Sequence, residues 1–376
     1  MSFISNYEKS IEYLYKKVHD LNGRARSCYV GGSTDDYSDK EFALMMLQDG
    51  CFILVLIEFY MLNKKLDCFS MIIDHLSILA LHHLYRDLVL LENQIPFEVL
   101  NVLMSKIYNE NEGLTPTMIK SFVYLCHWGK FQKEDTREKD EKKPPHLLGL
   151  LQAVISSKRG DHVETKPENV DMGMDWTSCL QSFGSVIDLQ AKGINFKLSN
   201  SISLYSTKTE KPKSISLRDI EFKSGFFNGE LKLPPLLIDS ETIAYYSNLI
   251  AYETCARMDS PVTAYISFMN PLIANPEDVK VLRSKRIILH TMMSDKEVYE
   301  MLKEIFSPGW QQNFLIYQGV RQDIERHYNN KIKIWIAEMR HKYFSQPWSV
   351  ISLLAAVVVI ILSFLQTFYT INPRKA

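Results

Sequence analysis

The stretch Trp348–Tyr369, WSVISLLAAVVVIILSFLQTFY, decides what class of protein this chain belongs to. Between Lys342 and Arg374 no residue carries a charge. Within that interval, Val350–Phe368 supplies the roughly 20 apolar positions that an α-helix needs to cross about 30 Å of hydrocarbon. The pattern predicts one transmembrane helix over 347–370, which anchors the chain in a lipid bilayer.

The residues that flank this helix indicate how it sits in the membrane. Trp348 and Tyr369 lie at its two ends, where amphipathic rings favour the headgroup layer, and we expect them to act as membrane anchors. The short tail 371–376 carries two cations, whereas four precede the helix: Lys331, Lys333, Arg340 and Lys342. Because cytosolic flanks carry the excess of Lys and Arg, the body is expected to be cytosolic.

The amino terminus, MSFISNYEKSIEYLYKKVHDLNG, has a helical amphipathic pattern and lacks the basic leader and apolar run of a signal peptide. A chain with this start and one late span is typical of a tail-anchored, single-pass protein. We expect it in the plasma membrane or an endomembrane.

Composition excludes several classes of function. The chain has 376 residues, a formal net charge of -1 and a sequence pI of about 6.8, so it lacks the strongly basic surface that binds nucleic acid. Its six cysteines form no CxxC pair and have no zinc-ligand spacing, so we interpret them as reduced thiols. No N-x-S/T sequon occurs. These features favour a body that faces the reducing cytosol.

The body, 1–345, is predicted to be mainly α-helical because its apolar residues recur at three- and four-residue spacing. A region at about 193–239 differs: alternating apolar and polar residues there indicate short antiparallel strands. Two polar stretches, near 130–145 and 157–175, have little to bury and are expected to be solvated loops. The fold class is therefore a helical body with a small antiparallel β region and one carboxyl-terminal transmembrane helix.

Local signals predict where several helices begin and end. Ser38 or Asp39 caps a helix that continues through a buried apolar stretch, and Pro96 separates two helices. Thr115 caps a helix with Pro116 in its first turn, and Ser294 begins a capping box with Glu297. Helical patterns are also predicted over 276–290 and from about 310 to 343.

Motifs for chemistry are missing from the sequence. It has no phosphate-binding glycine loop, nucleophile elbow or HExxH helix, so no catalytic, cofactor or metal residue is assigned. The histidines at 75, 82 and 83 with Asp74 are the best metal candidates, but two helical turns, about 10 Å, separate the outer pair. Cys126 and His127 are neighbours that point about 100° apart on a helix. Asp188 and Asp239 would need the fold to bring them together.

Seven strings in this sequence resemble one plant family, the domain of unknown function 247 proteins. They are DGCFILVLIEFY (49–60), DLVLLENQIPFEVL (87–100), HLLGLLQ (146–152), GELKLPPLLID (229–239), TIAYYSNLIAYETC (242–255), YISFMNPLIANPEDVKVL (265–282) and the membrane end PWS to QTFY (347–369). Their order and spacing match over nearly the whole chain. Family members usually carry an IGPYHHG-like segment before the ARSCY string, which here begins at Ala25.

The resemblance implies a single-pass plant membrane protein without an established catalytic activity. Some grass members are pollen-side self-incompatibility determinants, so the resemblance implies a recognition or signalling role with a protein partner. Two alternatives stay open. One is a membrane-anchored, hydrolase-like enzyme whose site is assembled from residues remote in sequence, and the other is a passive membrane scaffold.

Six polar or structural residues in the family strings are candidate site residues, although a structural role is favoured for them. Asn93 and Gln94 can satisfy backbone groups that Pro96 frees, and Asn248 can hydrogen-bond between helices. The full set is Glu92, Asn93, Gln94, Pro96, Asn248 and Glu253.

Overall fold

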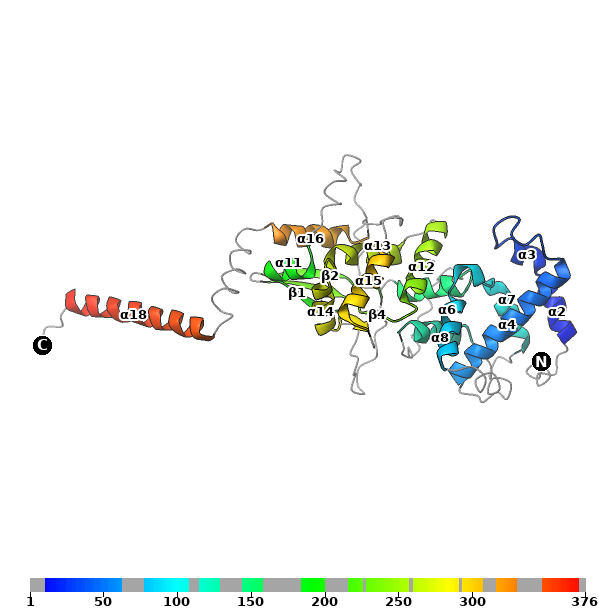
Figure 1. Ribbon diagram of the computed structural model, residues 1–376, viewed down its shortest axis with the longest axis horizontal. Helices are drawn as coiled ribbons and strands as arrows, with labels where there is room; N and C mark the ends of the chain where they lie inside the picture. The colour runs from blue at the N-terminus through cyan, green and yellow to red at the C-terminus, as the bar shows by residue number, and fades with distance from the viewer. Residues whose placement is uncertain are drawn as a thin grey trace, which may run out of the picture.

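The computed structural model describes a mainly helical protein (Figure 1). The described residues are 11–62, 78–107, 115–128, 144–157, 184–199, 216–225, 228–256, 260–290, 293–306, 316–329 and 347–371. The polar stretches near 130–145 and 157–175 lie almost wholly outside these ranges, as do Asp74, His75 and most of the predicted helix from 310 to 343.

Helices from the first third of the chain form one end of the body (Figure 1). The long helix α4 lies among them and packs against α2, α7 and α8. Many of its apolar side chains, such as Leu54 and Ile57, are fully buried. These elements are α2 (Ile11–His19), α3 (Asn22–Arg26), α4 (Asp39–Leu62), α6 (Ile78–Leu88), the 3₁₀ turn η1 (Leu91–Asn93), α7 (Phe97–Ile107) and α8 (Pro116–Trp128).

The remaining helices surround two small sheets. The buried hydrophobic side chains form a single cluster that extends from Leu14 to Ile324, so both ends of the body share one core. The elements are α9 (Leu147–Ile155), α11 (Val186–Ala191), α12 (Thr242–Ala256), α13 (Pro261–Met269), η2 (Asn270–Leu272), α14 (Pro276–Ser284), α15 (Asp295–Ile305) and α16 (Gln318–Tyr328).

The β region differs from the prediction of antiparallel strands alone. In the first sheet β1 (Ile194–Leu198) pairs parallel with β3 (Gly229–Leu233), which pairs antiparallel with β2 (Glu221–Ser224). In the second, β4 (Leu236–Ile238) pairs parallel with β5 (Ile288–His290). The antiparallel prediction was right for one of these three pairings. The helix predicted over 276–290 was wrong at its end, because α14 stops at Ser284 and β5 follows.

Helix boundaries follow the local signals. Ser38 Oγ accepts from the Glu41 backbone N–H, and Thr115 Oγ1 accepts from the Met118 N–H. Ser294 and Glu297 form the reciprocal capping box. The chain leaves helix between α6 and α7, around Pro96, as predicted. These helix boundaries were predicted correctly because each depends on contacts between residues that are close in sequence.

Two helices are apolar enough to raise the question of a membrane. The segment Asp39–Met61 is long and apolar enough to span a bilayer, but 67% of its most apolar part is buried inside the body. Helix α18 (Pro347–Ile371) lies apart from the body in Figure 1. The structure describes the side chains of its apolar segment Ala355–Phe368 without a gap, and all of them are exposed.

Candidate functional site

Helix α12 is the element at which several polar side chains from distant segments meet. It packs against α9, α13, α15 and η1. Three polar side chains on or next to α12 bind other elements. They are Glu241 just before its start, Asn248 in its middle and Glu253 towards its end. We call this set of contacts the α12 hub.

Asn248 joins α12 to the turn η1. Its Oδ1 accepts a 2.7 Å hydrogen bond from the Leu91 backbone N–H, and its Nδ2 donates to the Ala244 carbonyl at 2.8 Å. Each end of the amide is therefore bound to backbone. The side chain holds η1 against the helix and leaves little capacity for a ligand.

Gln94 organises the segment between α6 and α7. Its Nε2 donates to the Leu88 and Leu90 carbonyls at 2.9 and 2.6 Å, and its Oε1 accepts from the Leu148 N–H at 2.9 Å. The Tyr29 hydroxyl donates to the Gln94 backbone carbonyl at 2.9 Å. Since Gln94 is buried, these bonds satisfy groups that water does not reach.

The other residues of the LENQIPF string behave differently. Glu92 and Asn93 are exposed, and Asn93 Nδ2 makes a 3.3 Å bond to the Asp87 carbonyl. Pro96 is buried, and the N–H that follows it, from Phe97, donates to the Pro145 carbonyl at 2.7 Å. The Gln94 amide thus donates hydrogen bonds to carbonyls at and just after the end of α6, and not to backbone groups beside Pro96 as predicted.

Glu253 is a buried carboxylate that accepts four hydrogen bonds. Oε1 accepts from Gln152 Nε2 and from the Val262 N–H, both at 3.0 Å. Oε2 accepts from the Thr263 N–H at 2.9 Å and from its hydroxyl at 2.7 Å. The carboxylate thereby caps the first turn of α13 from a neighbouring helix. Burial raises the pKa of Glu253, and the four bonds partly oppose that rise.

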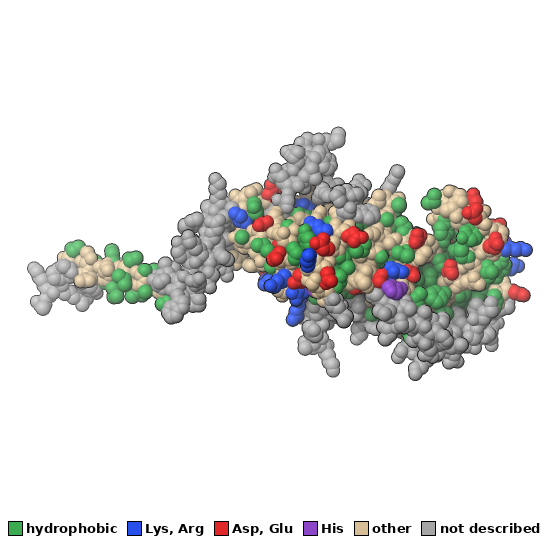
Figure 2. Space-filling view, in the orientation of Figure 1, with side chains coloured by type: hydrophobic (Ala, Val, Ile, Leu, Met, Phe, Trp, Pro, Cys, Tyr) green, Lys and Arg blue, Asp and Glu red, His purple; other side chains and the backbone are tan. Residues whose placement is uncertain are grey.

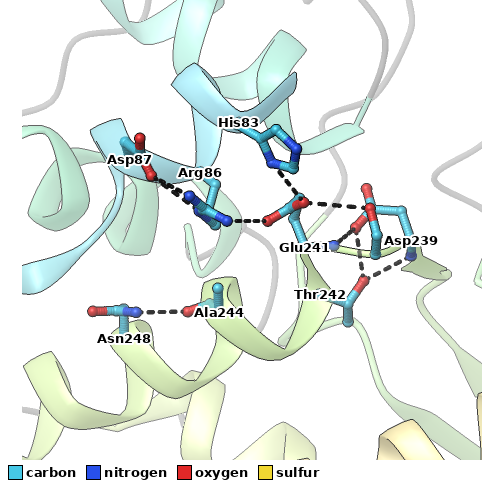
Figure 3. Close-up of polar contacts among 9 residues, drawn as sticks. His83, Arg86, Asp87, Asp239, Glu241, Thr242, Ala244 and Asn248 are labelled. Atoms are coloured by element: carbon cyan, nitrogen blue, oxygen red, sulfur yellow. Dashed lines mark hydrogen bonds and ion pairs between the residues drawn. The ribbon is translucent and has the colours of Figure 1, made fainter. Parts of the chain in front are cut away.

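Glu241 forms an ion-pair cluster that the sequence did not predict (Figure 3). Its side chain is 6% exposed and lies 3.3 Å from His83 Nδ1 and 3.6 Å from an Arg86 terminal nitrogen. Arg86 also binds Asp87 through two nitrogens at 2.9 Å each. The cluster ties the end of α6 to the start of α12.

Asp239 holds the turn that positions Glu241. Its Oδ1 accepts from the Glu241 N–H and from the Thr242 hydroxyl, both at 3.0 Å, and that hydroxyl accepts from the Asp239 N–H at 2.8 Å (Figure 3). In sequence, the string DSET shows only a helix start. Nothing local indicates that a histidine and an arginine from α6 will lie against it.

The His83–Glu241 pair has the form of a carboxylate that orients an imidazole, an arrangement found in general bases. His83 is 53% exposed, so its other ring nitrogen can reach solvent. In the described part of the chain, no hydrogen bond joins that nitrogen to a hydroxyl or thiol. The contacts that the structure describes for these residues link the end of α6 to the start of α12.

The other chemical candidates are also accounted for. Burial raises the pKa of the Cys126 thiol and lowers that of His127 to about 4, which is opposite to what a thiolate–imidazolium pair needs. Asp188 belongs to the capping box of α11 with Ser185, whereas Asp239 caps α12, and no described contact joins the two aspartates. Among described residues, no three His, Cys, Asp or Glu side chains are placed to hold a metal ion.

A separate open hollow of about 610 Å³ lies along β1 and β3. Lys197 and Lys285 line it together with Asn195, Asn228 and Glu230. Lys197 is paired with Glu230 at 2.5 Å, so one cation is already neutralised. None of the α12 hub residues borders this hollow.

Comparison with known proteins identifies the relatives of this chain. The UPF0481 protein At3g47200 of Arabidopsis thaliana is 27% identical over 96% of this chain and 75% of its own length. The UPF0481 protein At3g02645 of the same plant is 21% identical over 94% and 78%. No solved structure matches. The sequence profile described as "plant protein of unknown function" matches residues 1–362, so the chain belongs to the domain of unknown function 247 family.

Proposed function

We propose that this protein is a membrane-anchored recognition or signalling protein whose helical body presents a surface to a protein partner. The observation that carries the membrane part is the apolar exposure of α18. Eleven large hydrophobic side chains between Ile351 and Ile371 are at least 44% exposed. A helix with this surface needs an apolar environment that the body does not supply.

The dimensions of α18 suit a bilayer. At 1.5 Å per residue, its 25 residues extend about 38 Å, more than the roughly 30 Å of a hydrocarbon core. Moving one Val, Leu, Ile or Phe side chain out of water is worth about 1.5–3 kcal/mol. Its hydroxyls also suit lipid, since Ser363 and Thr367 bond to carbonyls one turn earlier in their own helix.

The proposed orientation has the body in the cytosol, at the plasma membrane or an endomembrane. The excess of Lys and Arg before α18 supports this choice. The described cysteines, at 28, 51, 126 and 255, are free thiols, which suits a reducing compartment.

The recognition role is favoured over an enzyme because the polar side chains that meet in the core bind backbone and each other. Asn248, Gln94 and Glu253 are all used in this way. A part in self-incompatibility is the narrower form of this proposal, and comparison of natural alleles tests it. Differences that gather on one exposed face support that form, whereas allele differences scattered through the buried core contradict it.

Alkaline carbonate extraction of membranes tests the anchor. The test variant is the full chain with Val359→Arg and Ile360→Arg, which places two charges near the middle of α18 at about 2.5–3.5 kcal/mol each. The control is Val30→Arg, because Val30 is an 84% exposed body residue.

Wild type and the Val30→Arg control are expected in the carbonate-resistant pellet, and the double variant in the supernatant. If wild type is extracted by carbonate, or if the double variant stays in the pellet, α18 is not the anchor.

A further inference from the structure

The exposed hydrophobic side chains of the body are unevenly distributed. Outside α18, six large hydrophobic side chains of the described residues are exposed, and five of them belong to α2, to the loop after α3 or to the start of α4. The five are Ile11, Tyr13, Val30, Tyr37 and Leu44, and the sixth is Ile187.

The loop between α3 and α4 combines apolar and acidic groups. Val30 is 84% exposed and Tyr37 is 46% exposed. Asp35 and Asp36 lie between them in the sequence, are exposed, and have no described Lys or Arg partner. We call these four residues the α3–α4 surface.

Arg26 holds this loop in one conformation. Its two terminal nitrogens donate to the Thr34 and Tyr37 carbonyls at 2.6 and 2.7 Å, and one lies 3.2 Å from Asp39. The guanidinium also stacks 4.4 Å from the centre of the Phe42 ring. A loop ordered before binding loses less entropy when a partner docks.

The α3–α4 surface lies at the end of the body away from α18 (Figure 1). Figure 2 shows hydrophobic and acidic side chains next to each other at this end, together with some Lys and Arg side chains. The described body ends with α16, and this loop lies at the other end of the body from α16 (Figure 1). A bilayer reached through the chain after α16 therefore leaves this loop accessible. The carboxylates also disfavour contact with anionic lipid headgroups.

We propose that the α3–α4 surface docks a protein segment that carries Lys or Arg beside apolar side chains. Asp35 and Asp36 pair with the cations, while Val30 and Tyr37 contact the apolar groups. This docking site rests on the proposed recognition function and gives it a location and a partner chemistry.

The test uses the full chain in nanodiscs of neutral lipid, which removes attraction of the probes to the membrane. The probes are three fluorescent peptides of equal length: Lys/Arg alternating with Leu, Glu/Asp alternating with Leu, and Lys/Arg alternating with Gly. Fluorescence anisotropy measures their affinities. The variants are Asp35→Lys with Asp36→Lys, and Val30→Ser with Tyr37→Ser. The matched control is Ile187→Ser, an exposed hydrophobic residue on α11.

The basic–apolar peptide is expected to bind most tightly, with an affinity that falls as salt rises. Each double variant weakens it about tenfold or more, and the control leaves it unchanged. Equal binding of the acidic peptide, or unchanged binding to both double variants, overturns the proposal. So does a concentration-dependent dimer of the chain that the Asp35→Lys, Asp36→Lys variant abolishes, because a second copy is then the occupant.

Failure of this site is distinguishable from failure of the proposed function. Wild type and both double variants are expected to stay carbonate-resistant and to keep their melting temperature, because the changed side chains are exposed. If wild type is anchored but the basic–apolar peptide does not bind, only the docking site is wrong. If wild type is extracted by carbonate, the anchored function itself is wrong.

Discussion

Replacing Glu253 by Ala is predicted to destabilise the body strongly. The substitution removes the acceptor of four hydrogen bonds at a site that is 1% exposed. A buried donor left without a partner costs about 1–3 kcal/mol. Because Gln152 and the Thr263 hydroxyl can rotate toward other partners, the expected loss is about 3–6 kcal/mol rather than the full sum.

This loss converts into a measurable change in melting temperature. An unfolding entropy of about 2.1 cal/mol/K per residue over about 345 residues gives roughly 1.4 °C per kcal/mol. Thermal unfolding of the detergent-solubilised full chain, followed by circular dichroism, is therefore expected to show a fall of about 4–8 °C. The control is Glu92→Ala, an exposed carboxylate, which should shift the midpoint by less than about 1 °C.

The same residue gives a pH dependence with a definite sign. Burial raises the folded-state pKa of Glu253 above its ordinary 4.5, so the folded state holds the proton more tightly than the unfolded state. Its contribution to stability is complete below about pH 4.5 and is lost as pH rises through the folded pKa. The glutamine of the Glu253→Gln variant cannot titrate. The melting temperature of wild type should therefore exceed that of Glu253→Gln by less at pH 7 than at pH 4.5. A margin that grows with pH, or a Glu253→Ala midpoint within 1 °C of wild type, would refute the reasoning.

Further predictions concern the other buried polar contacts. Gln94→Ala removes three hydrogen bonds and should cost about 2–4 kcal/mol, against about 1 kcal/mol for Tyr29→Phe; similar midpoints for the two variants in thermal unfolding would contradict this. Glu241→Gln should lower the midpoint less at high salt than at low salt, because it removes ion pairs with partly exposed His83 and Arg86; a salt-independent effect would argue against that cause. Burial lowers the pKa of His146 to about 4, and its Nδ1 accepts from an N–H at the start of α9, so this contribution is present above pH 6.5 and is lost as pH falls toward 4. His146→Asn keeps a capping acceptor and should flatten the melting profile over that range, whereas an unchanged slope would exclude His146 as its source.

The parts of the fold that could be predicted are those that depend on neighbouring residues. Ser294 and Glu297 form their capping box within one turn, and Pro96 interrupts helix by its own geometry. Pairing of strands depends on partners far along the chain. Apolar and polar residues alternate over Ile194–Leu198 as in a hairpin strand, but this strand pairs with a parallel partner. Residues 288–290 form a strand by pairing with β4, which is remote in the sequence.

The same limit applies to the α12 hub. Asn248 and Gln94 stood out because they are polar residues inside apolar strings, and both make contacts between segments. Glu241 and His83 each resemble ordinary helix residues, and only the fold brings the end of α6 beside the start of α12 and joins them in an ion pair. The role of Glu253 as a cap for α13 is likewise invisible until the two helices are adjacent.

Glycosylation mapping tests the membrane anchor and its orientation together. The sequence has no N-x-S/T sequon, so any N-glycan must sit on an added acceptor tag. We predict that a tag after Ala376 is glycosylated in microsomes and that a tag before Met1 is not. An unmodified carboxyl-terminal tag, or a glycan on the amino-terminal tag, would contradict a cytosolic body held by a membrane-spanning α18.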